Sequence, residues 1–183
     1  MNKMQNDIYK KIEWAFRNSN SPDELFDRFT DAIKLKISDL SLYKIFLANP
    51  ALSTDEIKMF TGKLLKEMPE ERFQLSMWTA KIFENRQMSY EFIENALHYY
   101  EIAMQSNPSS HEPLLEMINL YNRDMDLPSN KRILELVDSF IPSVNRKSKV
   151  YFSLAELYKK TNDLNNASRY LALANKAAER ESS

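Results

Sequence analysis

The 183-residue chain has no cysteine, one glycine and two histidines. The absence of cysteine excludes disulfides, thiolate nucleophiles and cysteine-ligated metal sites. The single glycine, Gly62, excludes the glycine-rich loops that hold phosphate groups, and it argues against a β-rich fold with many tight turns. His98 and His111 are too few for most histidine-based metal sites, and both are interpreted as structural or simply exposed. We therefore expect neither a metal nor a cofactor.

The chain also has no excess of charge of either sign and no long apolar run. Its 25 basic and 26 acidic residues give a net charge of −1, whereas proteins that bind duplex nucleic acid usually carry a strong positive charge. No apolar run approaches the roughly 20 residues needed to span a membrane. Asp7 and Glu13 stand where a secretory signal would have its apolar core. The sequence therefore predicts a cytoplasmic protein that does not associate with membranes.

Helical periodicity is the dominant pattern. Apolar residues recur at spacings near three and four, as in the N-terminal set Ile8, Ile12, Trp14, Ala15 and Phe16. No segment shows sustained alternation, so we predict an all-α protein without a sheet. The predicted helices span residues 4–18, 22–36, 39–48, 53–68, 71–86, 89–106, 111–124, 129–140, 147–161 and 164–180.

Serine residues mark four of the predicted helix starts. Ser21, Ser53, Ser89 and Ser129 can each accept a hydrogen bond from the helix backbone. Ser21 and Ser53 are followed three positions later by a glutamate, which is the pattern of a capping box.

Prolines suggest a repeat. Pro69, Pro108 and Pro142 each follow a predicted helix, and they are separated by 39 and 34 residues. A recurrence of this size is typical of stacked helical hairpins.

The C-terminal segment shows the repeat most clearly. Large and small residues share one face of each of its two helices, at Tyr151, Leu154, Ala155, Tyr158, Ala167, Leu171 and Ala174. Helices approach closely where side chains are small, so Ala155 is expected to face the second helix near Ala167. Asn162 lies in the turn between the helices, where asparagine tolerates the left-handed conformation. The segment resembles the tetratricopeptide repeat family, which prefers glycine at that turn.

The resemblance implies a right-handed superhelical stack of antiparallel hairpins, or α-solenoid. It is strongest over residues 89–180. We interpret 1–183 as a single helical-repeat domain. Its predicted hairpins are 5–37 and 38–69, both divergent, and the more typical 71–108, 111–142 and 147–180.

The resemblance also implies a binding groove, because in this family the first helices of the hairpins line a concave face that holds a segment of another protein. The positions that match this face are Asn119, Asn122, Arg123, Lys149, Phe152, Glu156 and Lys159. Some family members clamp a terminal carboxylate, but Leu115 and Ser153 stand where such a clamp has basic residues. A solvated loop and helix end remains the simpler interpretation of the basic residues around Lys149 and Lys159.

The sequence therefore predicts a non-enzymatic scaffold or adaptor that binds a partner protein or peptide, as an individual protein or as a subunit of a larger assembly. The alternative is a helical-repeat protein that binds single-stranded RNA. The balanced charge argues against nucleic acid, and no catalytic constellation is visible.

Two aromatic residues are not necessarily part of the core. Trp14 and Trp78 can instead mark an interface. The N-terminal hairpin has a wide apolar surface for an end helix, which predicts docking on a partner or on a second copy of the chain.

Overall fold

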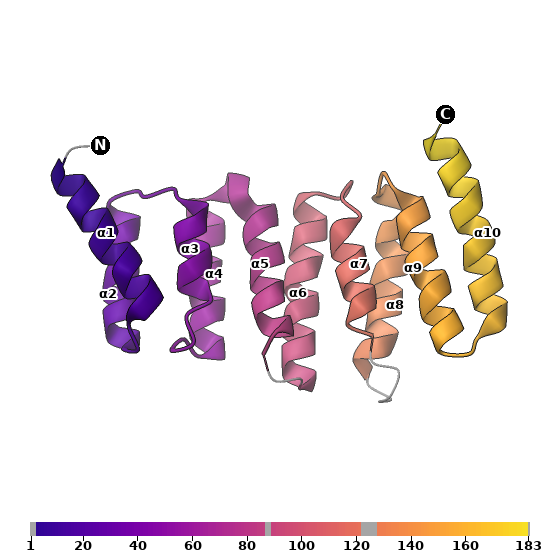
Figure 1. The fold of residues 1–183 in the computed structure, drawn as a ribbon, viewed down its shortest axis with the longest axis horizontal. Helices are drawn as coiled ribbons and strands as arrows, with labels where there is room; N and C mark the ends of the chain where they lie inside the picture. Colours follow the sequence, from indigo (N-terminus) through magenta and orange to yellow (C-terminus); the bar gives the residue numbers. More distant parts are fainter. Residues whose placement is uncertain (1–2, 87–88, 122–127, 183) are drawn as a thin grey trace. The chain divides into compact units, whose positions relative to one another are not determined.

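The computed structural model describes residues 3–86, 89–121 and 128–182, with side chains from Asn6 onward. Within these residues the protein is all-helical and contains no strand (Figure 1). None of the described helices is long and apolar enough to cross a membrane. By backbone contacts the chain divides into two compact units, Met1–Ile82 and Phe83–Ser183, here called unit 1 and unit 2.

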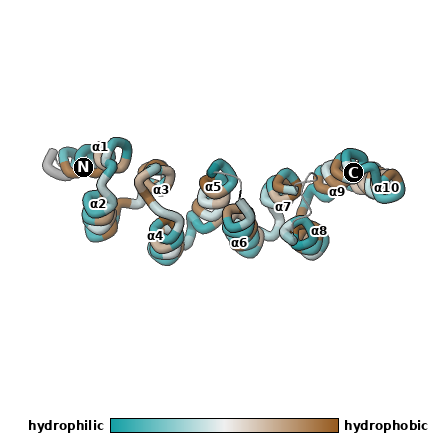
Figure 2. Tube along the Cα trace, turned by 90° about the horizontal axis from the view of Figure 1, so that it is seen from below, coloured by the Kyte–Doolittle hydropathy of each residue, from teal (hydrophilic) through white to brown (hydrophobic). Residues whose placement is uncertain are grey.

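Unit 1 holds four helices and most of a fifth. They are α1 (Lys3–Asn18), α2 (Pro22–Lys34), α3 (Leu40–Leu47), α4 (Thr54–Glu67) and α5 (Arg72–Glu84), with the 3-10 turn η1 (Pro69–Glu71) before α5. Within this unit α1 packs against both α2 and α3. Figure 2 shows α1 and α3 in one layer and α2 and α4 in the other.

A cluster of phenylalanine rings forms the core of unit 1. Phe46 lies at its centre, with ring centroids 4.5 Å from Phe16, 5.0 Å from Phe29 and 4.8 Å from Phe60. Nearby, the buried Asn49 side chain donates to the backbone oxygens of Phe16 and Ser19, at 3.0 and 3.1 Å. These contacts join α1 to the end of α3 and satisfy a buried amide that would otherwise be costly.

Unit 2 holds the remaining helices. They are α6 (Tyr90–Ser106), α7 (Glu112–Asn119), α8 (Pro128–Phe140), α9 (Lys147–Lys160) and α10 (Leu164–Glu181), with the 3-10 turn η2 (Ile141–Ser143) after α8. In this unit α6 packs against α7, α7 against α8, and α9 against α10, and α6 also packs on α8 and α7 on α9. Figure 2 shows α6 and α8 in one layer and α7 and α9 in the other. Arg132 of α8 ties the α6 and α8 layer together by pairing with Glu94 and Glu101 of α6.

The last two helices make the most extensive backbone contact of any helix pair in the described ranges. Ala155 of α9 is 6% exposed and Ala174 of α10 is fully buried, which agrees with the expectation that small residues allow close approach. Two details differ from expectation. Ala167 is only partly buried and Leu171 remains 46% exposed.

The local signals at helix ends are largely confirmed. Ser53 forms a complete capping box with Glu56, and Ser89 accepts a hydrogen bond from the backbone of α6. Asn162 adopts a left-handed φ of 61° in the α9–α10 turn.

Three predictions at helix ends were wrong. Glu24 does not complete a capping box, because its carboxylate accepts from the Ser19 hydroxyl at 2.6 Å. Ser129 is not a cap, because α8 already begins at Pro128 and the buried Ser129 hydroxyl has no hydrogen-bond partner among the described residues. Helix α7 ends at Asn119, before the predicted end at residue 124.

Candidate binding surfaces

Four of the predicted groove residues form one exposed stripe on α9. Lys149, Phe152, Glu156 and Lys159 are all exposed, and spacings of three, four and three residues place them on one side of the helix. Phe152 keeps 40% of its surface exposed, so an apolar ring stands among charged side chains. These four residues are called the α9 stripe.

The opposite side of α9 is fixed in the core of unit 2. Val150 and Leu154 are at most 1% exposed, and both α7 and α10 pack against this helix. The apolar side of α9 thus faces the core, and the α9 stripe lies on the opposite, exposed side of this amphipathic helix.

Contacts at both ends of α9 fix its rotation against α10. Near its start, the Glu181 carboxylate accepts hydrogen bonds from the amide of Ser148, at 3.0 Å, and from the Ser148 hydroxyl. Burial alone would raise the pKa of the Glu181 carboxyl, but the hydrogen bonds from Ser148 hold it below its usual value. At the other end the rings of Tyr158 and Tyr170 stack with centroids 5.3 Å apart.

His111 lies close to the start of the α9 stripe. Burial lowers the pKa of its imidazole, and the positive charges of Lys149 and Arg146 lower it further. Since the ordinary pKa of histidine is already below 7, His111 is neutral at neutral pH. The positive charge at this end of the stripe therefore belongs to Lys149 and Arg146.

The remaining predicted groove residues fall into two groups. Asn119 is exposed at the end of α7, a helix that packs against α9, and its side-chain amide donates to Glu116 at 3.4 Å. Asn122 and Arg123 lie outside the described residues. The structure thus brings Asn119 and the α9 stripe onto two neighbouring helices of unit 2.

Trp78 is half exposed and its indole is engaged within unit 1. Its Nε1 donates to the backbone oxygen of Lys44 at 2.8 Å, and the Lys44 ammonium lies 5.7 Å from the ring centroid. The ring is 36% exposed. Trp78 therefore ties α5 to α3 while it contributes to the surface of the unit.

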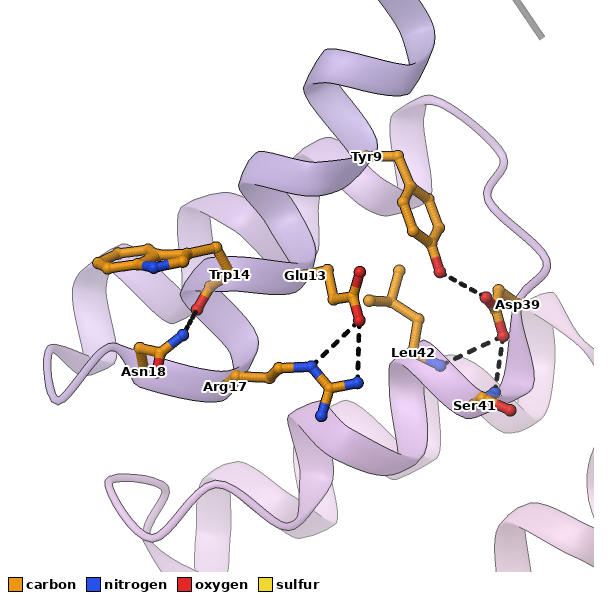
Figure 3. Close-up of polar contacts among 8 residues, drawn as sticks. All are labelled: Tyr9, Glu13, Trp14, Arg17, Asn18, Asp39, Ser41 and Leu42. Atoms are coloured by element: carbon orange, nitrogen blue, oxygen red, sulfur yellow. Dashed lines mark hydrogen bonds and ion pairs between the residues drawn. The ribbon is translucent and has the colours of Figure 1, made fainter.

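A cavity of about 600 Å³ opens between α1 and the α2–α3 connection. At its wall the Tyr9 hydroxyl donates to Asp39 at 2.6 Å, and Asp39 also caps α3 through the amides of Ser41 and Leu42 (Figure 3). The bond from Tyr9 lowers the pKa of the Asp39 carboxyl and raises that of the Tyr9 phenol to about 12.

Sequence reasoning missed this pair. An aspartate directly before a helix is a recognisable cap signal, but no local pattern links Asp39 to a tyrosine 30 positions earlier. Because both oxygens of the Asp39 carboxylate accept hydrogen bonds from the chain itself, we interpret its role as structural.

A second hollow, of about 270 Å³, lies over α1 and α2. It is lined by Lys10, Lys11, Trp14, Glu24 and Arg28. Trp14 is 62% exposed, and Figure 3 shows its ring directed away from the Tyr9–Asp39 pair. This is called the Trp14 hollow. Its tryptophan was singled out from the sequence, but its basic residues were not.

The described residues contain no group of three or more histidine, aspartate and glutamate side chains that could hold a metal ion. Comparison with models of known protein families, with curated proteins and with solved structures gives no significant match for this chain. The likeness to the tetratricopeptide repeat family therefore rests on the residues of the chain itself.

Proposed function

We propose that this protein is a non-enzymatic interaction scaffold of the tetratricopeptide-repeat type. It binds a segment of a partner protein across the first helices of its hairpins. In unit 2 the binding surface is the α9 stripe together with Asn119 of α7. The superhelical arrangement of the hairpins, with this surface on its concave side, belongs to the same proposal.

One observation carries the proposal. Residues selected from the repeat pattern alone lie together on the outward side of α9. An exposed aromatic ring flanked by Lys149 and Lys159 has the composition of a binding surface, because an apolar anchor supplies affinity and the surrounding charges set orientation.

The packing of α9 also supports this proposal. Ser148 and Tyr158 hold the helix in one rotation, so the exposed side chains start from a fixed backbone. A preorganised surface loses less conformational entropy on binding than a mobile one.

The test is capture of partners from extracts of the source cell by the wild-type chain and by the Lys149→Ala/Lys159→Ala variant. Both lysines are exposed, so their removal should change the free energy of unfolding by less than about 0.5 kcal/mol. We expect the variant to lose the specific partners while it keeps its helical signal and melting temperature.

The matched control is Lys176→Ala/Arg180→Ala, which removes two exposed charges from α10. This control should retain capture at the same salt concentration. Equal capture by all three proteins would show that the α9 stripe is not the binding surface.

A further inference from the structure

The two tryptophans of unit 1 differ in how much of their bonding capacity the protein itself uses. The Trp78 indole donates a hydrogen bond and receives a cation over its ring. For the Trp14 side chain, 62% exposed, the described residues provide neither a hydrogen-bond acceptor nor a ring or cation partner. The indole of Trp14 is therefore available to a ligand.

The basic residues beside Trp14 are available in the same way. Lys10 and Lys11 are exposed and form no ion pair with any part of the chain that is described. Arg28 has Asp31 as a partner at 3.1 Å, on a pair that is about 40% exposed. Two unpaired ammonium groups and one indole N–H thus border the same hollow.

These three groups have one property in common, because all of them donate hydrogen bonds and none accepts. A ligand that satisfies them must be rich in acceptors and negatively charged, and it must have a surface to pack on an indole ring. We propose that the Trp14 hollow binds an acidic segment of another protein, whose carboxylates pair with Lys10 and Lys11 while one of its side chains covers the Trp14 ring.

Glu24 favours a peptide over a nucleic acid as this ligand. One oxygen of its carboxylate accepts from Ser19, and a carboxylate has further sites that can accept hydrogen bonds from a ligand. A peptide backbone supplies N–H donors that can pair with a carboxylate, whereas a phosphodiester backbone offers none. The Glu24 carboxylate therefore suits a peptide, whose backbone N–H groups can pair with it.

The size of the hollow agrees with such a segment. A volume of about 270 Å³ is below the roughly 300–1,000 Å³ typical of pockets that enclose a small-molecule ligand. One or two side chains fit, and the rest of the segment must lie along the exposed surface.

The test uses Trp14 fluorescence in the full chain carrying Trp78→Phe, so that one tryptophan reports. The probe is a blocked hexaglutamate peptide, with blocked hexalysine and a six-residue oligothymidylate as comparisons. We expect a saturable change in emission with hexaglutamate, weaker at higher salt because exposed charge pairs are screened, and no change with hexalysine.

Two double variants locate the effect. Lys10→Ala/Lys11→Ala should weaken hexaglutamate binding at least tenfold, whereas Lys34→Ala/Lys66→Ala removes two exposed charges elsewhere in unit 1 and should leave it unchanged. Lys149→Ala/Lys159→Ala should also leave it unchanged, which keeps this site separate from the proposed α9 surface.

The proposal is overturned if hexaglutamate gives no saturable change, or if both unit 1 double variants bind it equally well or equally poorly. Tighter binding of oligothymidylate than of hexaglutamate would assign the hollow to nucleic acid instead. Emission that depends on the concentration of the protein alone would assign Trp14 to a contact between two copies of the chain.

Discussion

The first four helices and the last two fill the space between helices in different ways. In unit 1 the phenylalanine cluster around Phe46 fills the space between helices with large rings. In the α9–α10 hairpin the buried positions include Ala155 and Ala174, and the helices lie close together. Large rings tolerate variable helix spacing, whereas alanines require one narrow spacing and therefore leave a recognisable pattern in the sequence.

The largest expected effect is in the phenylalanine cluster. Phe46→Ala removes the ring that contacts Phe16, Phe29 and Phe60, and a buried phenylalanine changed to alanine typically costs about 3–5 kcal/mol. Urea unfolding measures the loss. Phe46→Leu should cost clearly less, and similar costs for the two variants would argue against close ring packing in this cluster.

The next effect should come from overpacking the C-terminal hairpin. Ala174 is fully buried, so Ala174→Leu has no free space and should cost about 1–3 kcal/mol. Ala172 on the same helix is exposed, and Ala172→Leu is the control, with a change within about 0.5 kcal/mol. Equal melting temperatures for the two variants would contradict the close approach of α9 and α10.

The Tyr9–Asp39 pair should give a smaller, pH-dependent effect. Asp39→Ala removes the cap of α3 and should cost about 1 kcal/mol. The pKa of the Asp39 carboxyl is held below its ordinary value of 3.8, chiefly by the bond from Tyr9. A depressed carboxyl pKa stabilises the fold above the unfolded pKa, and this stability is lost as the pH falls through the folded pKa.

Tyr9→Phe should therefore lower the melting temperature near pH 6, and this difference from the wild type should shrink as the pH falls below 3.8. The raised pKa of the Tyr9 phenol, about 12, means that the pair also stabilises the fold in a pH-dependent way on the alkaline side. Its contribution is present below pH 10 and is lost as the pH rises towards 12. A difference that is constant over the acid range would mean that the pair does not form.

The helices could be predicted from the sequence because the information for them is local. Apolar spacing placed every described helix, and Ser53, Ser89 and Asn162 set ends or turns within a few residues of themselves. Contacts between residues about 30 positions apart leave no local pattern in the sequence. Asn49 with Phe16, Ser148 with Glu181, and Tyr9 with Asp39 depend on the packed structure.

The candidate surfaces also differ in this way, because one lies on a single helix and the other depends on the packing of two helices. The four residues of the α9 stripe lie on one helix, so the positions that the repeat resemblance implies for them could be named together from the sequence. The Trp14 hollow needs α1 and α2 to lie side by side, so Trp14 was noticed but the neighbouring Lys10, Lys11 and Arg28 were not. Ser129 was wrongly predicted to be a cap, because a serine beside a proline can be either the cap residue or a residue of the first helical turn.

The central claim is that a partner segment lies along the α9 stripe, and site-specific photo-crosslinking tests it most directly. A photoreactive phenylalanine analogue is placed at Phe152 or, as the control, at the exposed Ala172 of α10. Both proteins are irradiated with the captured partner. We predict a crosslink from position 152 to one continuous segment of the partner and none from position 172. Crosslinking from position 172 alone, or equally from both positions, would contradict the account.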